Sequence, residues 1–366
     1  MSLFLLLLGA IALAGLQVLL LHLFGLRGMA YRRTFSARAV YEGEKVLMVE
    51  ELTNAKLMPV PWVRVEARMS PWLRFGRQEN LAISGESYHR SLFTLGPWRK
   101  ITRTHEVTCL RRGSYRIETV ALTCGDLLGL FERGKTVETP VELLVYPRIL
   151  DFNELVVPSR RWQGDVIVRR FIEPDPFLVN GIRGFRNGDS LRDVHWAATA
   201  RTGSLKVKTR DYTANPRLLL LVNVQVSDDQ WGELSEEQCA PIEECLAQAA
   251  TYAAWAQRNG VETGFLCNGR YSNVSTDHVA VEVPLGGGQG HLTQMLETMA
   301  RVKTIRRRSF APWLDDEVIP RGIGGCDIVV ISPYWSPLLE ERAGRLRRMD
   351  NSVTWVNPRG GMLENR

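Results

Sequence analysis

The chain has 366 residues, of which 45% are hydrophobic and 23% are charged, a composition typical of folded globular domains. Its formal net charge is +6, but Lys and Arg alternate with Asp and Glu along the sequence. Mixed charge of this kind argues against a polybasic tail for nucleic acid. We therefore expect two globular domains, a smaller additional part and no nucleic-acid partner.

The first element is an apolar segment directly after Met1, SLFLLLLGAIALAGLQVLLLHLFGL. A helix of about 20 such residues crosses a hydrocarbon core of about 30 Å. A cleaved signal sequence has basic residues before its apolar segment, but none precedes this one. Arginines instead follow the segment, from Arg27 onward. We expect residues 1–27 to be a single-pass anchor in the inner (cytoplasmic) membrane, with the soluble part in the cytoplasm. A signal peptide or a helical hairpin is the alternative.

Residues 28–150 contain short segments of alternating or β-branched residues between Gly, Pro and Asn turns. The segments are KVLMVEELTN, WVRVEARM, ESYHRSLFTL, THEVTCL and YRIETVALTC. Segments of this length and spacing predict antiparallel strands, and we expect an Ig-like β-sandwich. Pro59 and Pro61 predict an edge strand or a bulge, because proline cannot donate to a sheet ladder.

Residues 151–216 lack sustained periodicity and are expected to be an ordered linker. Residues 217–366 alternate between strands and helices, beginning with the buried strand RLLLLVNVQ and the amphipathic helix in EEQCAPIEECLAQAATYAAWAQRNG, which ends near Gly260. Further strands are expected in VETGFLCN, HVAVEVPL, CDIVVISP and SVTWVN, with helices from about His291 to Val302 and in PLLEERAGRLRRM. This alternation predicts a doubly wound α/β domain with its functional site at the carboxyl ends of the strands.

The six cysteines show neither CxxC spacing nor dense pairing. This pattern indicates neither a zinc site nor a disulfide framework, and we expect buried free thiols in a reducing compartment.

The segment FRNGDSLRDVHWAATARTGSLKVKTRDY, residues 185–212, is dense in charged and aromatic residues. One hypothesis is a hydrolase that uses the Asp189–Arg201 region, with His195 and a serine as partners, but no GxSxG elbow is present. We favour a structural clasp in which aspartates pair with arginines and Trp196 is buried against the sheet. A short helix capped by Asp189 or Ser190 then leads into a strand at SLKVKTRDY. The clasp comprises Gly188, Asp189, Arg192, His195, Trp196, Arg201 and Gly203.

The same segment resembles the signature of DUF58, a family of bacterial proteins. The signature has a GD pair, an arginine, a tryptophan, an Ala-Arg pair and a Gly-x-Leu segment, which correspond to Gly188, Asp189, Arg192, Trp196, Ala200, Arg201, Gly203 and Leu205. RRGSYRIETVALTCGDLLGLF and the N-terminal apolar segment agree with that family as well.

The resemblance implies a membrane-anchored protein whose β-rich domain leads into a von Willebrand factor A-like domain. It also implies a MoxR-type AAA+ ATPase and a transglutaminase-like membrane protein as partners. It implies no reaction, so we expect a non-catalytic interaction or assembly protein and not an enzyme.

A metal-binding A-like domain ends its first strand in Asp-x-Ser-x-Ser, because Mg²⁺ needs a carboxylate and hydroxyl oxygens. The corresponding positions here are Asn223, Gln225 and Ser227. Since the carboxylate is missing, we expect a degenerate site, no Mg²⁺ and no other cofactor. Partner binding is then expected at the loops after Val226 and around Gly286–Gly290.

Overall fold

The structure is a computed structural model. It divides by contacts into unit 1, which contains Met1–Ile149, Tyr271–Ser275 and Leu296–Lys303, and unit 2, which contains the remainder. The chain is a mixed α/β protein with an N-terminal apolar helix and several sheets. The residues that the structure describes are 2–76, 81–84, 88–126, 129, 131–151, 173–185, 194–213, 217–230, 234–272 and 279–358.

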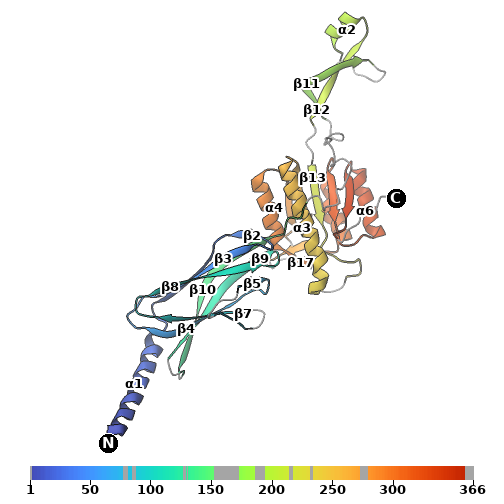
Figure 1. The fold of residues 1–366 in the computed structure, drawn as a ribbon. Coiled ribbons are helices and arrows are strands. Elements are labelled where there is room, and N and C mark those ends of the chain that lie inside the picture. Colours follow the sequence, from blue (N-terminus) through green and yellow to red (C-terminus); the bar gives the residue numbers. More distant parts are fainter. Residues whose placement is uncertain are drawn as a thin grey trace. The chain divides into compact units, whose positions relative to one another are not determined.

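Unit 1 begins with the helix α1, Ser2–Phe24 (Figure 1). Its Phe4–Phe24 part has a mean hydropathy of 2.6, and only 6% of its most apolar window is buried. Length and composition therefore suit a membrane span, and a signal sequence shares these properties. At the end of the helix, Lys56 Nζ donates to the carbonyl oxygens of Phe24 and Arg27, both at 2.8 Å. A lysine at this position satisfies carbonyls that have no partner within the helix.

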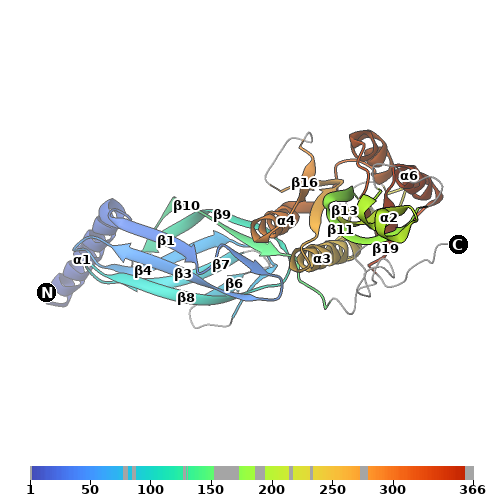
Figure 2. The same cartoon turned by 90° about the horizontal axis from the view of Figure 1, so that it is seen from above.

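The strands of unit 1 form two sheets, whose strands run alongside one another in Figure 2. The first has the order β1-β3-β8-β5, with β1 Met29–Phe35, β3 Lys45–Asn54, β8 Lys100–Cys109 and β5 Leu73–Phe75. The second has the order β2-β10-β9-β4-β7-β6, with β2 Ala39–Tyr41, β10 Glu132–Tyr146, β9 Gly113–Gly125, β4 Val60–Arg68, β7 Tyr88–Leu95 and β6 Leu81–Ser84.

Alternate residues of both sheets point into one shared core. Met48 and Leu52 of β3 meet Phe93 and Leu95 of β7 in this cluster, as the period of two in a half-buried strand requires. The five predicted strand segments coincide with β3, β4, β7, β8 and β9, so those predictions are confirmed.

The two prolines at the start of β4, Pro59 just before it and Pro61 within it, mark a bulge. The register between β4 and β7 shifts between Val60 and Val63, and β4 lies between β9 and β7 in its sheet. The predicted irregularity at Pro59 and Pro61 is therefore confirmed as a bulge within an interior strand and not as a sheet edge.

Residues 173–213 of unit 2, expected to belong to a linker, contain their own secondary structure. The strand β11, Glu173–Gly184, pairs antiparallel with β12, Lys206–Thr213, and the helix α2, Trp196–Thr202, lies between them in sequence. The strand predicted at SLKVKTRDY is confirmed as β12.

The main sheet of unit 2 has the order β16-β14-β13-β18-β19. Its strands are β13 Arg217–Val222, β14 Glu262–Cys267, β16 Val281–Gly286, β18 Asp327–Ile331 and β19 Ser352–Val356. The strands β14, β13, β18 and β19 are parallel, whereas β16 runs antiparallel to β14. The predicted strands are confirmed, and the sheet has the parallel centre expected of alternating strands and helices.

The long helices after β13 also lie where the sequence predicts. They are α3 Glu236–Arg258, α4 Gln289–Arg301 and α6 Pro337–Arg348. The second half of α4, from Leu296 onward, belongs to unit 1. The structure also contains elements that were not predicted from the sequence. These are the paired strands β15 Gly269–Tyr271 and β17 Val302–Arg306, the helix α5 Phe310–Trp313, a π-helix at Leu314–Val318 and a 3₁₀ helix at Ile319–Arg321.

Capping residues define the ends of α3. Ser235 and Gln238 form a capping box at its start. Gly260, with φ of +68°, follows the end and adopts the left-handed conformation that glycine tolerates. The predicted apolar face is buried, including Ile242 and Leu246, so this helix prediction is confirmed.

Both faces of the main sheet are covered. Leu219 and Leu221 of β13 pack with Trp313 of α5 and Leu339 of α6 in one hydrophobic cluster. α3 packs against β13, β14 and β18, and its ribbon lies beside β13 in Figure 1. Polar residues follow the apolar strands and lie at the edges of the sheet, beyond its covered faces.

Candidate functional site at the carboxyl edge of the sheet

Three neighbouring parallel strands end at one edge, and each is followed by a fully buried polar residue. Asn223 follows β13, Asn268 follows β14 and Ser332 follows β18, each with 0% exposure. Of these three residues, only Asn223 was expected from the sequence. The signal for the other two was available, because each also comes directly after an apolar strand of the predicted parallel sheet.

Hydrogen bonds join these strand ends. Asn223 Nδ2 donates to Ser332 Oγ at 3.0 Å, and Asn223 Oδ1 accepts from the Gln225 N–H at 2.9 Å. Asn268 Oδ1 accepts from the Val224 N–H at 2.9 Å. The Ser332 hydroxyl donates to the Tyr334 carbonyl at 2.6 Å. The side-chain groups at this edge are therefore engaged with one another and with the main chain.

Gln225 continues the network below the surface. Its Oε1 accepts from the Phe310 N–H at 2.8 Å, and its Nε2 donates to the Ser227 carbonyl at 2.6 Å. The side chain of Ser227 is exposed. The structure thus brings Asn223 and Gln225 together in the interior and leaves Ser227 on the surface loop.

The residues at this edge do not fit a Mg²⁺ ion, because the amide oxygens of Asn223 and Gln225 both accept main-chain N–H groups. Mg²⁺ requires oxygen ligands in near-octahedral geometry with negative charge to offset its dehydration. The nearby carboxylate of Asp228 accepts from the Tyr334 hydroxyl at 3.1 Å. Burial, followed by the Asp228 charge, raises the pKa of Tyr334 far above its ordinary value, so this hydroxyl remains a donor. That the chain binds no cofactor stays a prediction.

Aromatic side chains lie beside this network. The rings of Trp335 and Trp355 stack with centroids 5.3 Å apart, and the Trp355 Nε1–H donates to the Ser332 carbonyl. Both rings and Tyr334 are half-buried. We call Ser227, Asp228, Tyr334, Trp335 and Trp355 the carboxyl-edge surface.

The second binding loop expected from the sequence, Gly286–Gly290, lies at the opposite edge. Because β16 runs antiparallel to β14, Gly286 pairs with Thr263 at the start of β14. The expectation that this loop shares the functional edge is therefore wrong. The residue pattern of HVAVEVPL does not indicate the direction of this strand, because an alternating strand has the same pattern in either direction.

Part of the 185–212 segment lies outside the described residues, including Gly188, Asp189, Arg192 and the proposed capping residue Ser190. The described part differs from the expectation in two respects. α2 is capped by His195, whose Nδ1 accepts from the Ala198 N–H at 3.1 Å. Trp196 is 67% exposed, so the prediction that its ring is buried is wrong.

The geometry of His195 does not support the hydrolase alternative. In a catalytic triad, Nδ1 binds the carboxylate that orients the ring. Here Nδ1 caps the helix. Arg201 is exposed in the last turn of α2, and Gly203 ends that helix with φ of +66°. Val207 of β12 is 3% exposed, whereas Leu205, directly before this strand, is 42% exposed.

Comparisons with known proteins agree with the signature. A family model described as "Protein of unknown function DUF58" matches residues 181–322. We call these matched residues, 181–322, the DUF58 region. The protein YeaD of Bacillus subtilis (strain 168), itself described as uncharacterized, is 23% identical over 283 residues. The alignment covers 77% of this chain and 64% of YeaD, so the chain spans less than two thirds of that relative.

Solved structures similar to this chain cover about a third of it. The CARDB domain of a Pyrococcus furiosus protein is 15% identical and covers 32% of this chain and 91% of its own, with a TM-score of 0.22. A non-cellulosomal cohesin from Archaeoglobus fulgidus is 8% identical and covers 31% and 85%, with a TM-score of 0.20.

The DUF58 region supplies most of the edge network. Asn223, Gln225 and Asn268 lie within residues 181–322, whereas Ser332 and the aromatic residues follow it. The network therefore joins the DUF58 region to the last strands of the same sheet.

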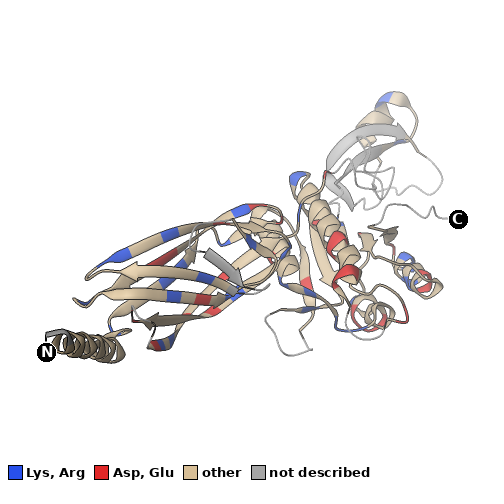
Figure 3. Cartoon of the chain, turned by 60° about the horizontal axis from the view of Figure 1, so that its bottom comes forward, with Lys and Arg blue, Asp and Glu red and all other residues tan. Residues whose placement is uncertain are grey.

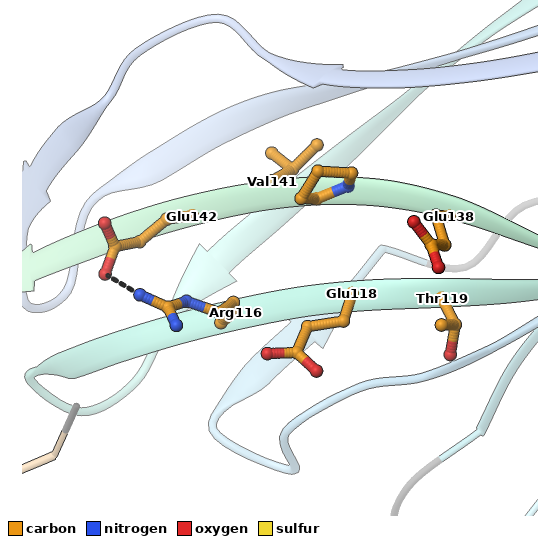
Figure 4. Close-up of a pocket in the computed structure, with 7 residues that line it drawn as sticks. Arg116, Glu118, Thr119, Glu138, Val141 and Glu142 are labelled. Atoms are coloured by element: carbon orange, nitrogen blue, oxygen red, sulfur yellow. Dashed lines mark ion pairs between the residues drawn. The ribbon is translucent and has the colours of Figure 1, made fainter. Parts of the chain in front are cut away.

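A separate hollow lies on unit 1, outside the DUF58 region, where the register of β9 and β10 shifts between Glu138 and Val141. Figure 4 shows its residues, with an Arg116–Glu142 ion pair of 3.7 Å. Its carboxylates lie on β9 and β10, and both acidic and basic residues occur along the strands of unit 1 (Figure 3). We interpret this hollow as a solvated face. Its lining residues are Arg116, Glu118, Thr119, Glu138, Pro140, Val141 and Glu142.

Proposed function

We propose that the chain is a non-catalytic, membrane-anchored interaction protein whose carboxyl-edge surface binds a MoxR-type AAA+ ATPase. In this proposal α1 is an uncleaved anchor in the inner membrane, the soluble part is cytoplasmic, unit 1 is an Ig-like sandwich, and unit 2 is von Willebrand factor A-like. A transglutaminase-like membrane protein is a second partner.

The proposal rests on one observation: the polar side chains at the ends of the parallel strands are hydrogen-bonded to one another and to the main chain. Ser332, the buried hydroxyl at this edge, bonds to the Asn223 amide and to the main chain of Tyr334. A nucleophile needs an adjacent base to be activated, and an amide is not a base. The edge therefore favours binding over chemistry.

The composition of the carboxyl-edge surface supports a protein as the ligand. Tyr and Trp are enriched in protein interfaces, because each combines a large apolar ring with a hydrogen-bonding group. Here Trp335 and Trp355 stack on each other, and the exposed Asp228 carboxylate accepts from the Tyr334 hydroxyl. Since no cation bridge is expected at Asn223, recognition depends on these side chains themselves.

A binding measurement with purified components tests the proposal. The full chain, in detergent, is mixed with a purified MoxR-type ATPase from the same bacterium, with ATP or with ADP. We expect nucleotide-dependent binding that Asp228→Lys weakens at least tenfold. Glu262→Lys is the matched control, because Glu262 is a partly exposed carboxylate at the amino end of β14. Equal loss in both variants, or no binding by the unmodified chain, would overturn the proposal.

A further inference from the structure

Six polar side chains are buried in the core of unit 1, at inward-facing positions of four strands. Tyr31 and Arg33 come from β1, Glu50 from β3 and His105 from β8, all in one sheet, whereas His89 and Ser91 come from β7 in the other. The exposures of Glu50, His89 and His105 are 0%, 1% and 2%. Polar residues at such positions are costly unless they have partners.

Glu50 lies at the centre of this cluster. Its Oε1 accepts from the Tyr31 hydroxyl and from Arg33 Nη2, both at 2.6 Å. Its Oε2 accepts from the Ser91 hydroxyl at 3.1 Å and lies 3.0 Å from His105 Nε2. One carboxylate oxygen is thus fixed by a phenol and a guanidinium, while the other faces an imidazole.

His89 has no such partner. Neither of its ring nitrogens makes a hydrogen bond to any described residue, and the second ring nitrogen of His105, Nδ1, lacks one as well. His89 Nδ1 lies 3.9 Å from Glu50 Oε1, beyond hydrogen-bonding distance. Leaving one buried polar atom without a partner costs about 1–3 kcal/mol. The ring is fully enclosed beside a carboxylate and a second imidazole, which points to a ligand between them.

We propose that Glu50, His89 and His105 bind a divalent transition-metal ion, with Zn²⁺ as the first candidate. One donor atom from each residue lies within 4.8 Å of the others. In a tetrahedral site with Zn²⁺ bonds of about 2.0–2.2 Å, neighbouring ligand atoms lie about 3.3 Å apart. The three donor atoms therefore need to move toward one another by at most about 1.5 Å to bind the ion. The proposal is independent of partner binding by unit 2.

The surroundings favour this class of ion. Two imidazoles and one carboxylate suit Zn²⁺ and its first-row neighbours. The three residues offer one carboxylate, and the positive charge of Arg33 already lies beside it. This arrangement disfavours Ca²⁺ and Mg²⁺, because these ions depend on several oxygen ligands. Tyr31 and Arg33 act as the outer partners that fix a ligating carboxylate. Since His89 and Glu50 come from different sheets, the ion cross-links the sandwich.

The test uses the full chain in detergent, with any affinity tag removed, loaded with Zn²⁺ and dialysed against metal-free buffer. We expect about one Zn²⁺ per chain by elemental analysis and a higher unfolding temperature with the ion. His89→Gln and His105→Gln are expected to weaken binding at least tenfold, whereas the control His195→Ala, which removes the cap of α2, retains the ion.

Folding is checked separately by circular dichroism. If the glutamine variants do not fold, X-ray absorption of the Co²⁺-loaded unmodified chain decides the question, because two imidazole ligands give a characteristic scattering pattern. A folded chain that binds no Zn²⁺ at micromolar concentration, binding that survives both substitutions, or a spectrum without imidazole would overturn the proposal.

Discussion

The side-chain amide of Asn223 donates a 3.0 Å hydrogen bond to the hydroxyl of Ser332 and so connects the ends of β13 and β18. Both side chains are fully buried. The amide is neutral, whereas a carboxylate at this position would carry a negative charge. Hydrogen bonds between protein groups therefore join the two strand ends without a cation. This relationship explains why we propose a binding surface that works without a cation.

The first prediction concerns restoration of a cation site. The double substitution Asn223→Asp and Gln225→Ser recreates the Asp-x-Ser-x-Ser pattern, with a carboxylate at the end of β13. We expect the unmodified chain to show no Mg²⁺-dependent change in unfolding temperature, and the double variant to be less stable without Mg²⁺ and partly restored by it. Thermal unfolding with 0 and with millimolar Mg²⁺ measures this.

Asn223→Asp alone is the control, because the second hydroxyl is then missing. A Mg²⁺-dependent stabilisation of the unmodified chain at the same edge would contradict our interpretation of Asn223 and Gln225.

The second prediction concerns the end of α1. Lys56→Met removes the charged donor that binds the carbonyls of Phe24 and Arg27, a loss of about 1–2 kcal/mol. We expect trypsin to cleave after Arg27 about tenfold faster in the detergent-solubilised variant. Lys100→Met is the control, since Lys100 forms a half-exposed pair with Glu51 that contributes little. Equal cleavage of the two variants would argue against a capping role.

The third prediction concerns packing in unit 1. An added Cβ at Gly125 would lie 2.6 Å from the Phe131 carbonyl and in overlap with the Trp62 ring, whereas one at Gly134 would have its nearest neighbour at 3.8 Å. We expect Gly125→Ala to destabilise unit 1 by about 1–3 kcal/mol and Gly134→Ala by much less. Denaturant unfolding followed by tryptophan fluorescence compares the two. A smaller effect at Gly125 than at Gly134 would show that this strand end is not closely packed.

The fourth prediction concerns the cysteines. All six are buried and none forms a disulfide, and burial raises the pKa of Cys109 to about 11 and that of Cys245 well above its ordinary value. At pH 8 a thiol with a pKa of about 11 has roughly two hundredfold less thiolate than an ordinary cysteine. We expect a disulfide reagent to react slowly with the native chain and rapidly with six thiols in denaturant. Rapid labelling of any thiol in the native chain would contradict this.

The periodicity of the sequence was sufficient to predict most elements. The helix over α3 and the strands β3, β13 and β18 have strong apolar patterns, and the structure confirms them. The direction of β16 was not predictable in this way, because an alternating strand has the same pattern in either direction. That missing information placed Gly286 at the wrong edge.

The buried cluster around Glu50 illustrates a signal that was present in the sequence. Val46, Met48, Glu50 and Leu52 occupy alternate positions of β3, so the pattern alone places Glu50 inside. Its partners come from other strands, as far away in sequence as His105, and only the pairing of the sheets brings them together. Trp196 shows the opposite case, since the clasp interpretation buried its ring against the sheet but the ring is exposed.

The most direct test of partner binding at the carboxyl edge is site-specific crosslinking. A photoreactive amino acid replaces Ser227, exposed at that edge, or Gly287, exposed at the opposite edge, and each variant is illuminated in membranes with the MoxR-type ATPase and ATP or ADP. We predict a nucleotide-dependent crosslink to the ATPase from position 227 and none from position 287. A crosslink from position 287 alone, or none from position 227 at saturating ATPase, would contradict it.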